Sequence, residues 1–260
     1  MSLIEHLDEL RKRIIISLIA IFLAMAGCFI FKSYILELMI QPIKGKELIT
    51  LSPTESFMTV FKVVGYAGLI VASPVIIYQI WAFVAPGLKT REKRVVIMAT
   101  IFTSVLFIGG VVFGWVFVLP RGLDFLLNYQ GDIFNQQVQA AKYFSFVAMF
   151  LLGFGVVFEI PAMLLTLARL GVVSHKTLAK NRKYAVLIGA LVSAVLTPGQ
   201  DLFSMIAMFI PAMLLFEFSV QASRVIEKRQ QQKEEAAAAE EAAEEAAEEA
   251  AAEAGSGESD

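Results

Sequence analysis

Carboxylates lie among basic residues in two short segments that flank long apolar runs. The first segment, Glu5 to Arg13, precedes the first apolar run and includes Glu9. The second, Lys89 to Arg94, lies between the second and third runs and includes Glu92. A carboxylate at a bilayer surface loses hydration, so it must be compensated by a structural ion pair or kept for a cationic guest. The two segments therefore indicate either a cation-binding site or a set of ordinary ion pairs.

A second group of candidate residues lies inside the apolar runs. Glu159 stands two-thirds of the way along the fourth run, with Pro161 two residues later, and Gln79 lies in the second run. An ionisable group at membrane depth is costly and is a functional candidate by default. The alternative, a protonated or hydrogen-bonded glutamate that holds helices together, stays open. In either case we expect Glu159 to face the interior of a helix bundle.

The composition is that of an integral membrane protein. Apolar residues make up 57% of the 260 residues, against roughly 45–50% in a typical soluble domain. The sequence contains no phosphate-binding Gly-rich loop, zinc-binding His motif, pair of cysteines or serine-protease elbow. We therefore expect neither an enzyme nor a cofactor or metal, and no nucleic-acid partner. The single cysteine, Cys28, is expected to pack as a small apolar residue.

Six apolar segments are each expected to form a helix, because lipid offers an open chain no other way to satisfy its backbone hydrogen bonds. The fifth has only 13 residues. Since ~20 residues span a hydrocarbon core, this segment either thins the bilayer or tilts inside the protein. The predicted fold class is all-α, a concave bundle of six transmembrane helices. The segments are Ile14 to Phe31, Val63 to Val84, Val95 to Leu119, Tyr143 to Leu167, Tyr184 to Leu196 and Leu202 to Val220.

The distribution of Lys and Arg predicts how the chain is oriented. With both termini in the cytoplasm, the inner segments hold 16 basic residues and the outer segments hold 6. This asymmetry satisfies the positive-inside rule. We therefore expect a multi-pass protein whose N and C termini are both cytoplasmic.

The outer connections are predicted to be structured. Ser52, followed by Pro53 and Glu55, is typical of a helix start. Pro120 is expected to close the third span, and Leu123 to Ala141 is expected to form short helices on the outer surface.

The C-terminal end differs in composition from the rest of the chain. Residues 234–260 hold 11 of the 24 acidic residues, which leaves 22 basic against 13 acidic residues elsewhere. Alanine and glutamate favour helix, but the segment has no apolar stripe that could pack. We expect residues 1–226 to form the six-span membrane domain and residues 227–260 to form an acidic cytoplasmic tail, solvated or disordered.

Five blocks follow one another in a characteristic order, and together they resemble the TatC family, the multi-spanning subunit of the twin-arginine protein translocase. The resemblance covers roughly residues 3 to 226, and the stretch Trp81 to Leu88 is its most specific part. The acidic tail lies outside it. The blocks are His6 to Arg13, Ser73 to Leu88, Glu92 with Arg94, Phe154 to Pro161, and Leu196 to Pro198 with Asp201.

The resemblance implies a receptor and core component of the translocase. Members of the family recognise signal peptides of folded cargo that carry two consecutive arginines before an apolar segment. They work with small single-span subunits of the TatA and TatB type, driven by the proton-motive force, in the lipid of the inner (cytoplasmic) membrane. A homo-oligomer within a larger complex is also implied. The recognition residues fall on Glu9, Phe83, Glu92 and Arg94, with Arg11 alongside, and the buried partner-binding position falls on Glu159, near Gln79 and Pro161.

Physical chemistry agrees with this function but leaves alternatives open. A guanidinium forms bidentate bonds with a carboxylate, each worth ~1.5–3 kcal/mol, and lysine lacks the planar fork that makes them. On the simpler reading, Glu9 pairs with Arg13 four residues later and Glu92 pairs with a neighbouring base. For the whole protein, the alternatives are a six-span proton-coupled transporter or channel that uses Glu159, and a passive scaffold.

Overall fold

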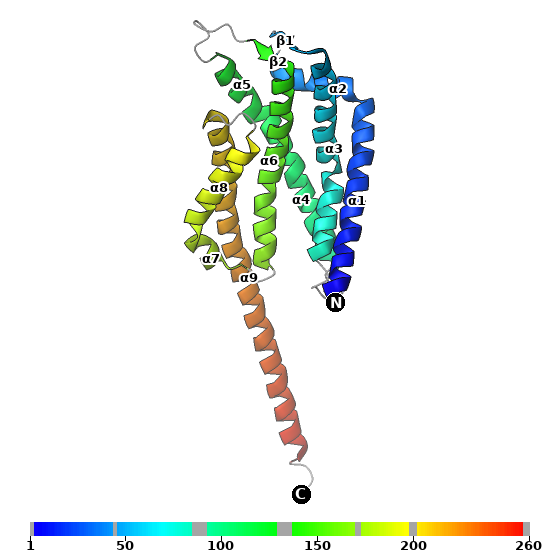
Figure 1. Ribbon diagram of the computed structural model, residues 1–260. Helices are drawn as coiled ribbons and strands as arrows, with labels where there is room; N and C mark the ends of the chain where they lie inside the picture. Colours follow the sequence, from blue (N-terminus) through cyan, green and yellow to red (C-terminus); the bar gives the residue numbers. More distant parts are fainter. Residues whose placement is uncertain are drawn as a thin grey trace.

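The protein is almost entirely helical in the computed structural model (Figure 1). The structure describes residues 3–43, 46–84, 93–128, 137–169, 173–197 and 202–256. The helices are α1 (Leu3–Ile30), α2 (Lys32–Ile40), α3 (Pro53–Val84), α4 (Lys93–Phe113), α5 (Leu119–Asn128), α6 (Ala140–Arg169), α7 (His175–Lys180), α8 (Arg182–Leu196) and α9 (Leu202–Ser256). A 3-10 turn (Gln41–Ile43), a π-helical turn (Gly114–Val118) and two short strands, β1 (Leu48–Ile49) and β2 (Val138–Gln139), complete the described elements.

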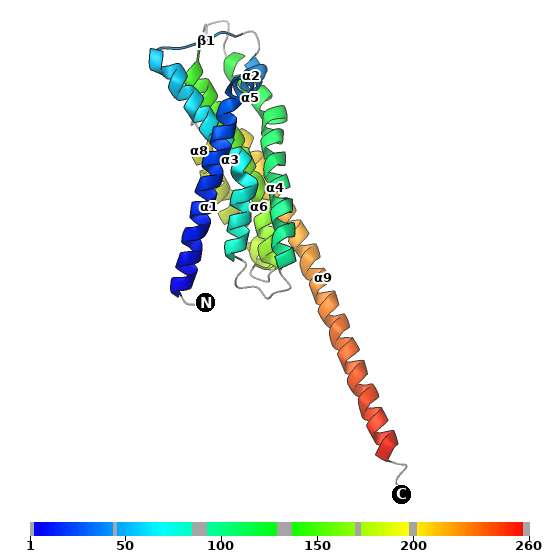
Figure 2. The same cartoon turned by 90° about the vertical axis from the view of Figure 1, so that its right-hand side faces the viewer.

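The long helices lie side by side in one bundle. Helix α1 packs on α3, and α6 packs on α3, α4 and α9. The start of α1, the end of α3 and the start of α4 lie at one end, which we call the N-terminal end (Figures 1 and 2). The strands and α2 lie at the opposite end, which we call the sheet end (Figure 1). Residues near the start of α1 and the end of α3 are therefore brought together at the N-terminal end.

Five helices of the described residues are long and apolar enough to cross a membrane, namely Ile4–Ile30, Pro53–Phe83, Ile97–Asn128, Ala140–Arg169 and Leu202–Gln232. Large apolar side chains remain outside the bundle, as at Phe22 and Ile30, which are 68% and 78% exposed. Lipid is the medium that such surfaces require. Helix α8 has 15 residues, so it is roughly 22 Å long, against a hydrocarbon core of about 30 Å. The sixth span therefore stays a prediction.

Helix α6 forms the centre of the core. Its residues Val147, Phe154 and Val157 are fully buried, and the main cluster of buried apolar side chains is built around them. The ring of Phe154 lies 4.9 Å from that of Phe150 and 6.1 Å from that of Phe113. Cys28 is buried in α1, as predicted.

The prediction that Pro120 ends the third span is wrong. The chain stays helical from α4 through the π-helical turn and into α5, where Pro120 is the second residue. Proline is tolerated in the first turn of a helix, and the wider π turn just before it relieves the clash with the preceding carbonyl. Helix α5 then reaches α9, since the rings of Phe125 and Phe203 stack with centroids 4.2 Å apart.

The segment Leu123 to Ala141, which is predicted to form short helices, contains the end of α5 and also strand β2, which the prediction missed. Strand β2 pairs in parallel with β1, with Leu48 opposite Val138 and Ile49 opposite Gln139. The pair joins the connection before α3 to the connection before α6. The hydroxyl of Tyr143 donates to the carbonyl of Met39 at 2.6 Å, which ties the same two regions a second time.

The predicted helix start at Ser52 is confirmed, because α3 begins at Pro53. The carboxylate of Glu55 lies in the first turn and accepts two backbone hydrogen bonds. Its Oε2 accepts from the amide of Leu51 at 2.8 Å, and its Oε1 accepts from the amide of Ala141 at 3.1 Å. Glu55 therefore caps α3 and also fastens the start of α6 to it.

Helix α9 continues far past the bundle (Figure 2). It runs without interruption from Leu202 to Ser256, so the acidic segment prolongs the last apolar helix. The boundary predicted at residues 226 and 227 falls inside this helix and stays a prediction.

We predict that Glu55→Ala lowers the melting temperature of the purified protein by roughly 5 °C, because two backbone amides lose their shared acceptor. Glu47→Ala is the matched control, since Glu47 is an exposed carboxylate in the same connection. Thermal unfolding of both variants in the same detergent measures the difference. Equal melting temperatures for the two variants would contradict the role assigned to Glu55.

Candidate functional site

Five side chains meet where α1 crosses α3 at the N-terminal end. His6, Glu9 and Arg13 are three and four residues apart on α1, so they share one face of that helix. Gln79 and Phe83 are four residues apart on α3 and share the face opposite. We call these five residues the α1–α3 site. It contains Glu9, Phe83 and Gln79 of the predicted functional residues.

A three-membered polar contact forms the inner part of the α1–α3 site. Arg13 donates from Nε to Oε1 of Glu9 at 3.0 Å, and its Nη2 makes a second, shorter contact with the same oxygen. Its Nη1 donates to Oε1 of Gln79 at 3.2 Å. The Glu9 and Arg13 side chains are only 20% and 21% exposed, and Gln79 is 8% exposed. The ion pair between Glu9 and Arg13, one of the two alternatives, is therefore present. The pair is shielded from solvent, and Arg13 also binds Gln79 on a second helix.

An aromatic contact forms the outer part of the α1–α3 site. The rings of His6 and Phe83 stack with centroids 4.4 Å apart and an angle of 20° between their planes. Phe83 therefore contacts α1 at His6, three residues before Glu9. Arg11 is exposed on another face of α1. Glu92 lies outside the described residues, and of Arg94 only the backbone, in the first turn of α4, is described.

Helix α4 fixes the end of α3 that carries Phe83. The indole Nε1 of Trp81 donates to Oγ1 of Thr103 at 3.3 Å. Thr103 is almost completely buried, and its hydroxyl lies 2.9 Å from the carbonyl of Ala99. Sequence analysis did not single out Thr103, because a threonine in an apolar run gives no local signal of a partner 22 residues away.

Glu159 lies on α6 and is half buried. Its Oε1 is buried within the protein and has no hydrogen-bond partner among the described residues. Pro161, two residues further along α6, is fully buried. The sequence placed Gln79 in the same group as Glu159, whereas the structure joins Gln79 to Arg13. A buried carboxylate oxygen without a donor is costly, so Glu159 marks a position where a proton or a partner group is needed.

Close contact between α4 and α6 positions Glu159. A methyl group added at Gly110 would lie 2.6 Å from the carbonyl oxygen of Phe154 and 2.7 Å from Cβ of Phe158. One added at Gly155 would lie 2.7 Å from the ring of Phe107. Small residues allow such close approach between helices in a membrane, where packing holds helices together. Glycine at these two positions therefore allows the close packing of α4 against α6, the helix that carries Glu159.

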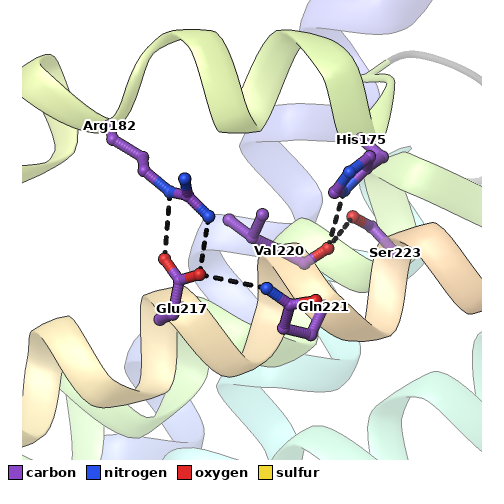
Figure 3. A network of polar contacts seen from close by, with 6 residues as sticks. All are labelled: His175, Arg182, Glu217, Val220, Gln221 and Ser223. Carbon is purple, nitrogen blue, oxygen red and sulfur yellow. Dashed lines mark hydrogen bonds and ion pairs between the residues drawn. The ribbon is translucent and has the colours of Figure 1, made fainter.

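A polar network joins α7 and α8 to α9 (Figure 3). Arg182 donates from Nε to Oε2 of Glu217 at 3.1 Å and from Nη2 to Oε1 at 2.6 Å. Nδ1 of His175 lies 2.9 Å from the carbonyl oxygen of Val220, which also accepts from Ser223 at 2.8 Å. These contacts hold the short helix α8 against α9. No local signal in the sequence indicates this pair, because Arg182 and Glu217 are 35 residues apart in the chain.

A bundle of apolar helices with a shielded polar contact at one end and a half-buried glutamate in its central helix defines a polytopic helical membrane protein. The chain belongs to the TatC family, because the family model described as Sec-independent protein translocase protein (TatC) matches residues 5–211. It is therefore a component of a Sec-independent, twin-arginine protein translocase.

Individual relatives and solved structures agree with the family. The Sec-independent protein translocase protein TatC of Carboxydothermus hydrogenoformans is 40% identical over 232 residues, covering 88% of this chain and 96% of the relative. The TatC protein of Aquifex aeolicus is 37% identical, covering 89% of this chain and 98% of the relative. A crystal structure of the twin arginine translocase receptor TatC is similar with a TM-score of 0.78 and 37% identity, covering 85% of this chain and 99% of that chain.

We predict that Gly110→Ala destabilises the protein by about 1–3 kcal/mol, because its methyl group meets a backbone carbonyl that cannot move alone. Gly109→Ala is the matched control, since a methyl group there has nothing within 4 Å. The control gains helix propensity without a clash and is expected to be neutral or slightly stabilising. Thermal unfolding in one detergent compares the two, and equal stability would show that α4 and α6 can separate at no cost.

Proposed function

We propose that the protein is the receptor and core component of the twin-arginine translocase, and that it binds the arginine pair of a signal peptide at the N-terminal end. Glu9 and Glu92 each accept one guanidinium, and Phe83 contacts the apolar part of the leader. Arg11 and Arg94 flank these carboxylates and repel cationic segments that lack the correct geometry. Of these residues, Glu9 and Phe83 lie together in the α1–α3 site.

One observation carries this proposal: Glu9 binds a guanidinium, that of Arg13. Nε and Nη2 of Arg13 both contact one oxygen, Oε1, so two donors of the planar group converge on one acceptor, which the single nitrogen of a lysine cannot reproduce. The site is only about one-fifth exposed. Partial shielding strengthens charge-assisted bonds compared with those at an open surface, so discrimination between arginine and lysine is expected here.

The orientation follows from charge. With the N-terminal end in the cytoplasm, the 16 basic residues of the inner segments and the 6 of the outer segments obey the positive-inside rule. We infer that α8 is the sixth span, held to α9 by the polar network of Figure 3 and crossing a locally thinned membrane. The α1–α3 site then faces the compartment in which cargo is made.

Glu159 is the proposed contact for a single-span partner subunit. Its buried, unpartnered oxygen supplies an acceptor for a polar group on a partner helix, and such a group would otherwise be unsatisfied in lipid. Several copies of the protein, with these partners, form the assembly that exports folded cargo at the expense of the proton-motive force.

We predict that Glu92→Gln lowers the affinity for a twin-arginine signal peptide about tenfold or more, because one charge-assisted bidentate contact is lost. Photocrosslinking and equilibrium binding of a labelled leader measure the change, with a twin-lysine leader as reference. The double replacement of Glu9 and Glu92 should bring both leaders to the same weak affinity. Wild-type affinity in Glu92→Gln would remove Glu92 from the site.

We predict that Glu159→Ala largely abolishes export and weakens crosslinking to single-span partners, while the protein remains folded. Met163→Ala is the matched control, because Met163 lies one turn later on α6 and is 59% exposed. Export of a folded reporter and the melting temperature are measured together. Normal export in Glu159→Ala would leave Glu159 a purely structural role.

A further inference from the structure

We propose that Arg13 is an internal substitute for the signal-peptide arginine, which occupies Glu9 while the receptor is empty and must be displaced by the guest. This inference rests on the proposed receptor function. It assigns to Arg13 a role in setting the affinity for leaders, which neither the family resemblance nor the function of Glu9 requires.

Both oxygens of Glu9 are closed in the structure. Oε1 accepts from two nitrogens of Arg13. Oε2 is inaccessible to solvent and has no hydrogen-bond partner among the described residues. A guest guanidinium therefore cannot reach Glu9 unless side chains of the α1–α3 site move. An ordinary surface ion pair would leave part of the carboxylate open to water and to a guest.

Two contacts between α1 and α3 flank Glu9 along α1. Arg13, four residues later, donates to Gln79 on α3, and His6, three residues earlier, stacks on Phe83. These contacts hold α1 against α3 before and after Glu9, whose side chain is 20% exposed.

Displacement of Arg13 costs every leader the same free energy, so the competitor lowers the affinities for twin-arginine and twin-lysine leaders by the same factor. The preference between the two leaders comes from the bound state, in which an arginine replaces the contact that Arg13 gives up and a lysine offers a point charge without the fork. Arg13 therefore sets how strongly a leader must contact Glu9 before it binds.

The alternative role for Arg13 is structural support of α1 by a pair of residues four apart. Loss of such a pair weakens the helix by a few tenths of a kcal/mol. It would lower or leave unchanged the affinity for a leader, whereas loss of a competitor raises it. The two roles therefore predict opposite signs for binding.

The test measures binding of labelled twin-arginine and twin-lysine leader peptides to the full-length protein in lipid nanodiscs by fluorescence anisotropy. We expect Arg13→Gln to raise the affinity for both leaders about tenfold, the equivalent of one charge-assisted contact removed from the competitor. The ratio of the two affinities is expected to stay close to that of the wild type, because both leaders displace the same competitor. Arg13→Lys keeps the charge without the fork and is expected to lie between Arg13→Gln and wild type.

Lys12→Gln is the matched control, because it removes one positive charge from the adjacent, exposed position of α1. It is expected to leave both affinities close to those of the wild type. An equal effect of Lys12→Gln and Arg13→Gln would overturn the inference, since bulk charge would then explain both. Weaker or unchanged binding of both leaders to Arg13→Gln and Arg13→Lys would overturn it as well.

The outcomes separate this inference from the function on which it rests. If the wild type binds both leaders equally, the receptor function fails and the inference fails with it. If the wild type prefers arginine and neither leader binds more tightly to the Arg13 variants, only the inference fails. Melting curves accompany each variant, and Gln79→Met, which removes only the second anchor of Arg13, gives the same test with a smaller expected gain if Arg13→Gln does not fold.

Discussion

The rest of the structure depends on the buried packing of α6. In lipid the helices gain nothing from hiding apolar surface, so close contact and satisfied polar groups must hold them together. Gly110 and Gly155 allow α4 and α6 to approach until backbone and ring atoms touch, and the fully buried Phe154 and Val157 complete the contact. Helices α3 and α9 pack on other parts of α6. Every described residue with a proposed function is carried by α6 or by a helix packed directly or indirectly against it.

Two polar regions use this frame in different ways. At the N-terminal end, the α1–α3 site holds a carboxylate in contact with a guanidinium, so its charge is compensated before any guest arrives. Within the bundle, Glu159 has one buried oxygen without a partner among the described residues. Oε2 of Glu9 is likewise buried without a partner among the described residues, but its Oε1 is bound to Arg13. The two carboxylates thus have one unsatisfied oxygen each, and the one on α1 also has a bound cation.

Local signals in the sequence predicted local structure well. The Ser52, Pro53 and Glu55 pattern located the start of α3, and the spacing of Glu9 and Arg13 identified their ion pair, because both depend on residues within one helical turn. Contacts between distant residues left no such signal. The bond from Arg13 to Gln79 joins residues 66 apart, and that from Glu55 to Ala141 joins residues 86 apart. The prediction that the third span ends at Pro120 failed because a π turn just before this residue allows the helix to continue, and the residue types give no sign of that turn. The roles of Glu92, Arg94 and Arg11 stay predictions.

The pairing of β1 with β2 has a consequence for the order in which the chain can assemble during synthesis. Leu48 cannot find its strand partner until Val138 has been made, by which time α1, α3 and α4 have already been produced. Closing a loop of this length costs conformational entropy before any reward is gained. The pairing of β1 with β2 is therefore a late event in biogenesis. A nascent chain that stops before residue 139 would present β1 as an unpaired strand edge to the chaperone or insertase that accompanies it.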